Sequence, residues 1–355
     1  MGHLVLIGAG HAHMEVARQA DRLVAAGLEV TLIDPGAFWY SGAATAMASG
    51  ALEVNDARAD PAALDRPITQ IKARAVAIRP SERIVVLEDG RRVAFDFLSI
   101  NTGSQVSPNA LTQSGAITVK PVSNLAHVRA QVEAACGRMN IAVVGTGATG
   151  VEVALSLAAL QRRLGAPVST QLVGPGPLLA GWPEAAARMA DVARVEAGVA
   201  RVVARAARLE AGALVMEDGS QTPADLVVAA TGLDAQLPEG LDAGAKGAPV
   251  GPDLSWIHDA AIFAAGDCAH MTHAPRPKLG VFGVRAAPTL INNLIQAAKG
   301  SPRRRRYDPQ TRWLSIMDLG DRTGLARYGR WSHRSRAALA LKRHIDARFV
   351  RRYQP

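Results

Sequence analysis

Two stretches of the chain share one pattern of apolar and polar positions. An apolar run at residues 3–7 leads into Gly8-Ala9-Gly10-His11-Ala12-His13, and a run at residues 141–144 leads into Gly145-Thr146-Gly147-Ala148-Thr149-Gly150. Each run is typical of a buried strand, and a helical pattern follows each glycine cluster. A strand, a tight glycine turn and a helix N-terminus together form a cradle for phosphate groups. The pattern therefore predicts two dinucleotide sites in one chain.

The two units continue in the same order. The first predicts a strand at residues 28–33, a hairpin turning at Asp89-Gly90 and a closing strand that ends in Thr102-Gly103. The second repeats these features at residues 168–173, Asp218-Gly219 and Thr231-Gly232. We therefore predict an α/β protein with two Rossmann-like dinucleotide-binding domains and a small C-terminal unit.

The later segments set the predicted domain boundaries. A short strand at residues 262–265 precedes Gly266-Asp267, and a helix is expected at residues 284–298, which indicates a return to the first domain. In the last helix Leu341, Ile345, Phe349 and Tyr353 predict one apolar stripe. The boundaries are residues 1–118 and 233–300 for the first domain, 119–232 for the second and 301–355 for the C-terminal unit.

An acidic residue distinguishes the first site from the second. Asp34 ends the strand after the first cradle, 21 positions beyond His13, where a carboxylate can accept hydrogen bonds from an adenosine ribose. The matching strand of the second unit runs into Gly174-Pro175-Gly176-Pro177, which offers no Asp, Glu or Arg to discriminate NAD from NADP. The first unit is predicted to bind a dinucleotide, whereas the ligand of the second stays open.

The net charge of +9 comes from the C-terminal unit. Residues 301–355 hold 14 Arg and one Lys against four Asp, whereas the first 300 residues hold 25 basic and 27 acidic groups. A basic surface attracts anionic lipid or an acidic partner. Alternatively, the apolar stripe of the last helix is buried in the protein core or in a homodimer interface. The basic residues could also simply form a solvent-exposed face in a chain that uses arginine more than lysine. Nucleic acid is not an expected partner.

The composition of the chain further limits the class of protein and its expected location. The 355 residues, 48% of them hydrophobic, suit several domains with their own cores, and no apolar run approaches the roughly 20 residues that span a bilayer. The first strand begins too early for a signal peptide, so we expect a cytoplasmic protein, or one on the inner face of the cell membrane. Cys136 and Cys268 are too distant in sequence for a CxxC pair, and no metal site is predicted.

Taken together, these motifs resemble the pyridine nucleotide-disulfide oxidoreductase superfamily over residues 1 to about 300. The segments that carry the resemblance are the two glycine clusters, Asp34, Asn101-Thr102-Gly103, Val151-Glu152, Ala230-Thr231-Gly232 and Phe263-Ala264-Ala265-Gly266-Asp267-Cys268. The resemblance implies that the first cluster and the Gly-Asp motif bind FAD, and that the second unit takes NAD(P)H where it binds a nucleotide.

Within the superfamily the chain is similar to the branch of type II NADH:quinone and sulfide:quinone oxidoreductases, which lacks a redox disulfide. It resembles most the flavoprotein domain fused ahead of selenophosphate synthetases, a group that implies no particular reaction. That likeness rests on the paired histidines of the first cluster, Trp39-Tyr40-Ser41-Gly42, residues 275–281, Arg312-Trp313-Leu314-Ser315-Ile316 and Asp346-Ala347-Arg348-Phe349. The chain departs from the sulfide:quinone enzymes because neither of its two cysteines is placed to act beside the flavin. It departs from the type II NADH dehydrogenases because it carries Arg285-Ala286 where they have paired glutamines near the quinone.

The motifs and the resemblance together predict the site residues. For FAD these are Gly8, Gly10, His11, His13, Asp34, Thr102, Gly103, Gly266, Asp267, Lys278, Gly280 and Val281, and for NAD(P) they are Gly145, Gly147, Gly150 and Glu152. The candidate catalytic residues are Glu152, Lys278, His270 and His273. Glu152 could instead complement a helix dipole, and Lys278 could be an ordinary surface lysine.

Three hypotheses of function follow. The first is an FAD-dependent oxidoreductase that accepts a hydride from NAD(P)H at flavin N5 and reduces a small acceptor such as a quinone, with Lys278 stabilising negative charge on the reduced ring. The second is a flavoprotein that oxidises a small sulfur or selenium compound without nicotinamide. The third is a flavin-holding module without enzymatic activity that docks through its basic tail.

Overall fold

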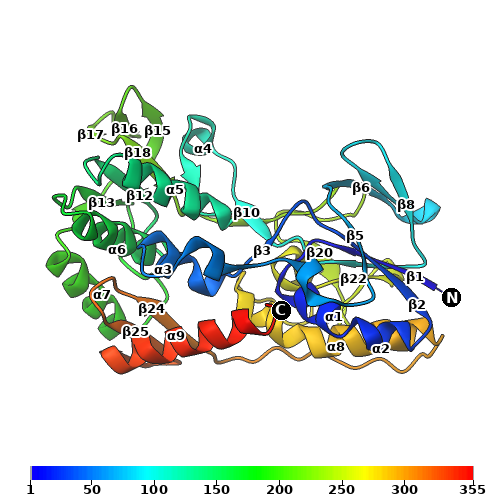
Figure 1. Cartoon of the computed structure of the whole chain (residues 1–355). Helices are drawn as coiled ribbons and strands as arrows, with labels where there is room; N and C mark the ends of the chain where they lie inside the picture. The colour runs from blue at the N-terminus through cyan, green and yellow to red at the C-terminus, as the bar shows by residue number, and fades with distance from the viewer. Residues whose placement is uncertain (1, 355) are drawn as a thin grey trace.

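The computed structural model of the chain describes residues 2–354. Its first domain is built on an eight-stranded sheet (Figure 1). The strand order is β23 (Ala269–Met271), β20 (Ala248–Val250), β21 (Ser255–Trp256), β22 (Asp259–Ala264), β9 (Phe97–Ile100), β1 (Gly2–Ile7), β2 (Leu28–Ile33) and β5 (Thr69–Ile71). The central strands are parallel and buried over most of their length, which explains why Leu4–Ile7 of β1 are all apolar.

The second domain repeats this plan with a smaller, wholly parallel sheet. Its strand order is β11 (Ile117–Thr118), β18 (Leu226–Ala229), β12 (Ile141–Val144), β13 (Thr170–Val173) and β14 (Ala200–Val202). The sheet packs against α5 (Ser123–Ala134), α6 (Ala148–Arg163) and α7 (Glu184–Glu196). The predicted fold class, two Rossmann-like domains followed by a small C-terminal unit, is confirmed.

Each domain carries a three-stranded antiparallel sheet at the place of its predicted hairpin. In the first domain this sheet is β6 (Ala75–Arg79), β7 (Ile84–Leu87) and β8 (Arg92–Ala94), and in the second it is β15 (Ala206–Glu210), β16 (Ala213–Met216) and β17 (Gln221–Pro223). A short antiparallel pair, β10 (Ser104–Val106) with β19 (Leu233–Ala235), also forms where the chain passes between the domains. The two halves therefore share their accessory elements as well as their sheets.

The remaining helices of the first domain flank its sheet or reach toward the second domain. They are α1 (His11–Arg18), α2 (Ala20–Val24), α3 (Ala44–Ala48) and α8 (Gly280–Ala298). In Figure 1 α1, α2 and α8 lie together beneath the first sheet, whereas α3 lies toward α6 of the second domain. A single-turn helix α4 (Ala110–Gln113) and the short strands β3 (Phe38–Trp39) and β4 (Arg58–Ala59) complete the two domains.

The C-terminal unit spans the lower edge of both domains (Figure 1). It contains the antiparallel sheet β24 (Leu314–Asp318), β25 (Gly324–Tyr328) and β26 (Trp331–Ser335), followed by α9 (Arg336–Arg351). At the end of α9 the ring of Phe349 stacks on that of Tyr40, with centroids 4.3 Å apart. The tail thus packs on the first domain and helps to wall the region around β3.

The predicted apolar stripe of α9 does not stay on one face. Phe349 and Tyr353 are buried, but Leu341 and Ile345 are 46% and 43% exposed. A four-residue step advances a helix by about 400°, so a stripe with this spacing drifts by about 40° at every step. Consequently only its C-terminal half faces the core.

The three units meet at Glu152, in the second turn of α6. Its Oε1 accepts hydrogen bonds from Thr45 Oγ1 of α3 (2.9 Å) and from the backbone N–H of Asp318 in β24 (2.8 Å). Burial raises the pKa of Glu152, and the nearby Lys342 ammonium opposes that rise. Lys342 itself donates to Gly42 O (2.5 Å) and to Asp346 Oδ2 (2.9 Å). This buried polar junction fixes the arrangement of the units.

The junction predicts how Glu152 variants will behave. We expect Glu152→Ala to lower the free energy of unfolding by about 3 kcal/mol, because it leaves two buried donors without their acceptor and removes a negative charge near Lys342. Glu152→Gln should cost less, since its amide oxygen can accept both hydrogen bonds. Urea denaturation followed by circular dichroism measures the difference. Glu184→Ala, at an exposed position of α7, is the control, and equal stability of the two alanine variants would contradict the assignment.

Candidate functional site

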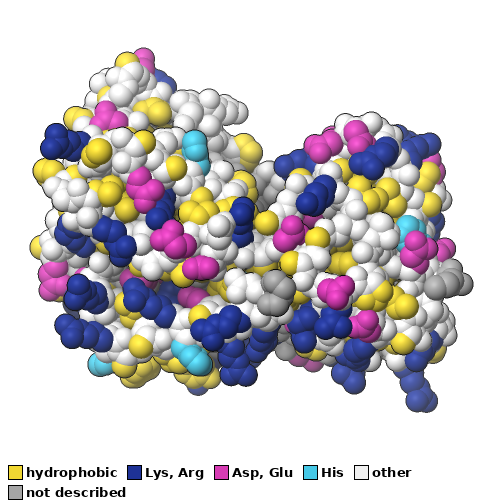
Figure 2. All heavy atoms as spheres, viewed as in Figure 1, with side chains coloured by type: hydrophobic (Ala, Val, Ile, Leu, Met, Phe, Trp, Pro, Cys, Tyr) yellow, Lys and Arg dark blue, Asp and Glu magenta, His cyan; other side chains and the backbone are white. Residues whose placement is uncertain are grey.

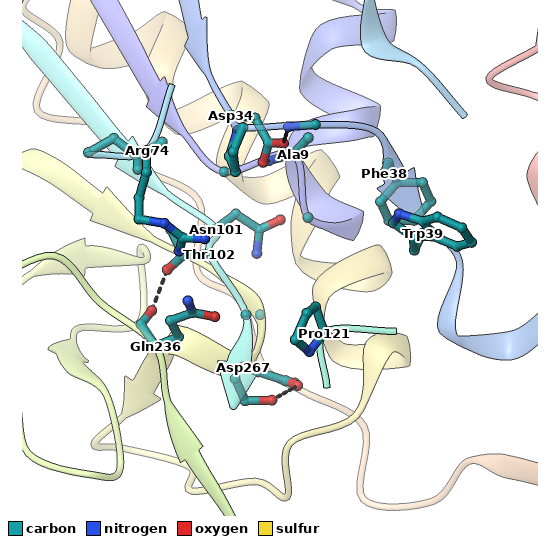
Figure 3. A pocket seen from close by; sticks show the side chains of 18 of the residues that line it. Ala9, Asp34, Phe38, Trp39, Arg74, Asn101, Thr102, Pro121, Gln236 and Asp267 are labelled. Atoms are coloured by element: carbon teal, nitrogen blue, oxygen red, sulfur yellow. Dashed lines mark hydrogen bonds between the residues drawn. The ribbon is translucent and has the colours of Figure 1, made fainter. Parts of the chain in front are cut away.

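A cavity of about 750 Å³ opens at the carboxyl ends of the central strands of the first sheet. Open α/β sheets bind their ligands at this edge, and the volume suits a small-molecule site. Figure 3 shows Asp34, Asn101, Thr102, Gln236 and Asp267 arranged around it. The N-termini of α1 and α8 both reach the cavity, through Gly10 and Gly280, so two helix dipoles favour negative charge there.

Nine of the residues predicted from the sequence for the first cofactor line this cavity. They are Gly8, Gly10, His11, Asp34, Thr102, Gly103, Gly266, Asp267 and Gly280. They come from five separate segments of the chain, and the first domain brings them to one edge of its sheet. The cavity therefore has the residue set of a dinucleotide site.

Asn101, at the end of β9, holds the cavity wall together. Its Oδ1 accepts hydrogen bonds from the backbone N–H groups of Ala12 (2.9 Å) and His13 (3.2 Å), and its Nδ2 donates to Ala265 O (2.6 Å). The side chain thus caps α1 from outside the helix. A Cβ on Gly10 would lie 2.5 Å from this Oδ1, and a Cβ on Gly266 would lie 2.6 Å from Nδ2. Glycine is required at both positions because the amide lies between them.

Asp34 occupies the predicted position at the end of β2. Its Oδ2 accepts from the N–H of Ala9 (2.7 Å) and its Oδ1 from the N–H of Gly36 (2.9 Å). Burial raises the pKa of Asp34, and these two hydrogen bonds oppose the rise. Arg74 lines the same end of the cavity, which therefore suits the polar adenosine end of a dinucleotide.

His11 and His13 have different environments. His11 lines the cavity, with its ring edge-to-face against Phe38 at 5.1 Å between centroids. His13 lies beneath the glycine turn and is fully buried. Its Nδ1 donates to Gly8 O (2.7 Å) and its Nε2 accepts from Ser99 Oγ (2.8 Å). His13 thus supports the cradle from behind and is not among the lining residues.

The Gly-Asp motif carries an ion pair that the sequence did not indicate. Asp267 Oδ2 accepts from Lys120 Nζ (2.7 Å) and from Ser104 Oγ (2.7 Å). Burial alone would raise the pKa of Asp267, but these partners outweigh it and hold the pKa below its usual value. Lys278 instead donates to the main-chain oxygen of Asp267 (2.6 Å), and burial lowers its pKa. Lys120, and not Lys278, is the lysine that lines the cavity.

The second glycine cluster has the geometry of a nucleotide turn. A Cβ on Gly150 would lie 1.9 Å from Gly145 O, so the helix approaches the turn closely, whereas a Cβ on Gly147 would meet open space. An arginine that sequence analysis missed lies at the end of β13. The guanidinium of Arg201, from β14, donates to Gly174 O (2.8 Å) and Gly176 O (2.6 Å). Nothing local in sequence points to this residue, because parallel pairing with β13 brings it there.

Several predicted residues lie away from the first cavity. Val281 and His13 are next to lining residues without lining it themselves, and Gly145, Gly147, Gly150 and Glu152 belong to the second domain. His270 lies in the edge strand β23, and His273 contacts the main-chain oxygen of Tyr307 at 3.1 Å.

Both cysteines are free thiols. Cys268 is buried with Sγ 3.3 Å from Ala265 O, and Cys136 is exposed. Across residues 2–354 no cluster of three or more His, Cys, Asp or Glu could hold a metal ion.

The buried histidines predict a loss of stability in acid. Burial lowers the pKa of both His11 and His13 to about 4, against 6.5 for a free histidine. The unfolded chain therefore binds these protons first, and stability falls as the pH drops from about 6.5 toward 4, by up to about 3 kcal/mol for fully buried His13. Chemical denaturation across this range should show a shallower slope for His13→Gln than for the wild type. The exposed-site variant His127→Gln should keep the wild-type slope, and an unchanged slope in His13→Gln would contradict the prediction.

Comparison with known proteins places the chain in a family. Residues 2–296 match the family model of pyridine nucleotide-disulphide oxidoreductases. No curated protein sequence matches the chain. The predicted superfamily is confirmed by the family model, whereas the likeness to the domain fused to selenophosphate synthetases stays a prediction.

The fold is also similar to that of solved structures. The sulfide:quinone oxidoreductase of Aquifex aeolicus aligns with a TM-score of 0.79 and 18% identity over 100% of this chain and 92% of its own. The ferredoxin reductase for the CYP199A2 system of Rhodopseudomonas palustris aligns with a TM-score of 0.73 and 19% identity over 96% of this chain and 93% of its own. An NAD-dependent persulfide reductase from A. fulgidus aligns with a TM-score of 0.73 and 18% identity over 92% of this chain and 64% of its own.

The match covers both glycine clusters and the cavity between the two helix N-termini. The cavity fits FAD, because its glycine cradle is open, Asp34 stands at one end and Asp267 at the other. The chain therefore belongs to the pyridine nucleotide-disulphide oxidoreductase family and is an FAD-dependent oxidoreductase.

Proposed function

We propose that the protein oxidises a reduced nicotinamide nucleotide, with NADPH preferred, and reduces a small acceptor such as a quinone. The observation that carries the proposal is the meeting of the two domains at one end of the FAD cavity. Lys120, Pro121, Val122 and Ser123, at the start of the second domain, line the cavity of the first. A nucleotide bound at the second glycine cluster would thus have its reactive end next to that of FAD.

Bound FAD supplies hydride acceptance at N5 and electron release to an acceptor. The protein's own residues bind the cofactor and orient it. The turn at Gly8–Gly10 and the N-termini of α1 and α8 hold the pyrophosphate, and Asp34 accepts hydrogen bonds from the ribose. His11 has its pKa lowered to about 4 by burial and stays neutral at pH 7, so it packs against the cofactor without adding charge.

Arg201 favours NADPH over NADH. It lies at the end of β13, where an acidic residue would select NADH by binding the ribose hydroxyls. Four hydrogen bonds from Nη1 and Nη2 to carbonyl oxygens hold the guanidinium there. Its positive charge and the remaining Nε–H suit a 2′-phosphate. This supports the nicotinamide route over the alternative of a sulfur or selenium donor. The placement of the two thiols, neither of which lines the FAD cavity, supports it as well.

A second cavity supports a flat, mostly apolar acceptor. It has a volume of about 350 Å³ and lies between α3 and α9. Most of its lining is apolar, with Ala43, Ala46, Leu52, Ala347 and Val350, and its charged residues include Asp56, Arg343 and Arg351. Ser41 lines the FAD cavity and Ala43 lines this one, so a single turn of chain, Ser41–Ala43, separates the two.

The donor can be identified by anaerobic rapid mixing. We expect NADPH to bleach the flavin absorbance roughly tenfold or more faster than NADH at equal concentration, because one charge–phosphate contact is worth about 1.5–3 kcal/mol. Arg201→Met should reduce this ratio. Equal rates would contradict the NADPH preference. No bleaching by either nucleotide would contradict the nicotinamide route and leave the sulfur or selenium donor as the function to test.

We further propose that α9 rests on an anionic membrane surface. Leu341 and Ile345 are exposed on it, and Arg348, Arg351 and Arg352 line a shallow hollow at its C-terminal end. Figure 2 shows Lys and Arg gathered along the lower edge of the molecule, where α9 lies in Figure 1. Among residues 2–354 no helix is both long and apolar enough to cross a bilayer. An interfacial helix with apolar and cationic residues binds such a surface from one side.

Point substitutions test this attachment better than removal of the tail, because Phe349 and Tyr353 pack in the core of the first domain. Leu341→Asp with Ile345→Asp should abolish co-flotation with vesicles that contain anionic lipid, while the FAD content stays unchanged. Val192→Asp with Val195→Asp, on exposed α7, is the matched control and should float like the wild type. Flotation of the α9 variant at the wild-type level would refute the attachment.

A further inference from the structure

One lysine of the second domain reaches into the FAD cavity of the first. Lys120 follows β11, which pairs with β18 in the second sheet, whereas Asp267 follows β22 in the first sheet. Lys120 Nζ lies 2.7 Å from Asp267 Oδ2, with the two side chains 24% and 10% exposed. Both line the cavity, so this ion pair joins the two domains inside the wall of the cofactor site.

The ion pair is arranged so that part of its bonding capacity stays free. Ser104 Oγ donates to Asp267 Oδ2 and accepts from Lys120 Nζ (2.6 Å), which closes a triangle of hydrogen bonds. Every hydrogen bond that reaches the Asp267 carboxylate from residues 2–354 ends on Oδ2. Over the same residues Lys120 uses two of its three N–H donors. Oδ1 of Asp267 and one N–H of Lys120 therefore remain for a ligand.

The charge of this triangle matters because FAD carries an anionic pyrophosphate. An uncompensated, nearly buried carboxylate beside it would repel the cofactor. Three basic groups face Asp267: Lys120, His11 from α1 and Lys278 from the loop before α8. The buried thiol of Cys268 also lies near it, and burial raises the pKa of that thiol, so it carries no charge at pH 7. His11 is neutral at pH 7 because burial lowers its pKa to about 4, and Lys278 donates to the main-chain oxygen of Asp267. Lys120 is thus the cation in contact with the carboxylate.

We propose that Lys120 is an FAD-binding residue that the second domain contributes to the cofactor site of the first. Its charge compensates Asp267, so that Oδ1 of Asp267 accepts a hydrogen bond from a hydroxyl of the cofactor. The free N–H of Lys120 donates to an oxygen of FAD. The FAD site is therefore completed by the second domain. This inference rests on the binding of FAD that underlies the proposed function.

The test is FAD reconstitution of the full-length apoprotein, followed by flavin fluorescence. We expect Lys120→Met to weaken FAD binding roughly tenfold or more at pH 7, and Lys120→Arg to retain most of the affinity. Lys299→Met, after the far end of α8, removes the same charge and should bind FAD like the wild type. In Lys120→Met the pKa of Asp267 rises, so its affinity for FAD should recover as the pH falls from about 7 to about 5 and the carboxylate is neutralised. A purely structural role for Lys120 would not produce this recovery.

Wild-type affinity in a folded Lys120→Met protein would overturn the inference, as would a loss of affinity that does not change with pH. If Lys120→Met does not fold, the test compares the FAD affinity of Asp267→Asn with that of the double variant Lys120→Met/Asp267→Asn. Neither of these variants carries an unpaired buried carboxylate. The double variant should bind FAD more weakly than the single one, since it lacks the N–H of Lys120, and equal affinity would overturn the inference. A wild-type protein unable to retain FAD would instead refute the proposed function.

Discussion

The cofactor cavity depends on the side-chain amide of Asn101. One end of this amide accepts two N–H groups from the start of α1, and the other end donates to the carbonyl of Ala265, just before the Gly-Asp motif. A primary amide offers an acceptor oxygen and two N–H donors on one flat, uncharged group. A carboxylate would face the Ala265 carbonyl with like charge, and an aliphatic group would leave buried donors unpaired. The glycines at 10 and 266 follow from this contact, because both lie against the amide.

A second constraint, the junction around Glu152, positions the domains relative to that cavity. Glu152 contacts α3 and β24, and Lys342 of α9 reaches Gly42, beside Ser41 at the cavity wall. Burial lowers the pKa of Lys342 on its own, but Glu152 and Asp346 reverse the effect and the pKa lies above its usual value. A buried charge network of this kind is costly unless every member is paired, and the observed arrangement of the three units provides that pairing. The glutamate that sequence analysis nominated for catalysis thus has a clear structural role.

The sequence predicted local features well and long-range ones poorly. Gly8, Asp34 and Asp267 line the cavity, and their common location could be predicted because each stands at a fixed place relative to its own strand and parallel strands bring such places to one edge. Lys120 and Arg201 were not found, since strand pairing and the packing of one domain on the other decide their positions. No spacing along the chain encodes either contact.

The predicted apolar stripe of the C-terminal helix differs from the structure for a similar reason. Its apolar residues repeat every four positions, and sequence analysis placed them on one stripe, but the structure buries Phe349 and exposes Leu341. One element therefore serves two surroundings. Its C-terminal end closes the aromatic wall beside His11 and Tyr40. Its N-terminal half buries Ala338 and Leu339 against the small C-terminal sheet and leaves Leu341 exposed. The helix thus connects the aromatic wall of the cofactor site to the surface of the molecule.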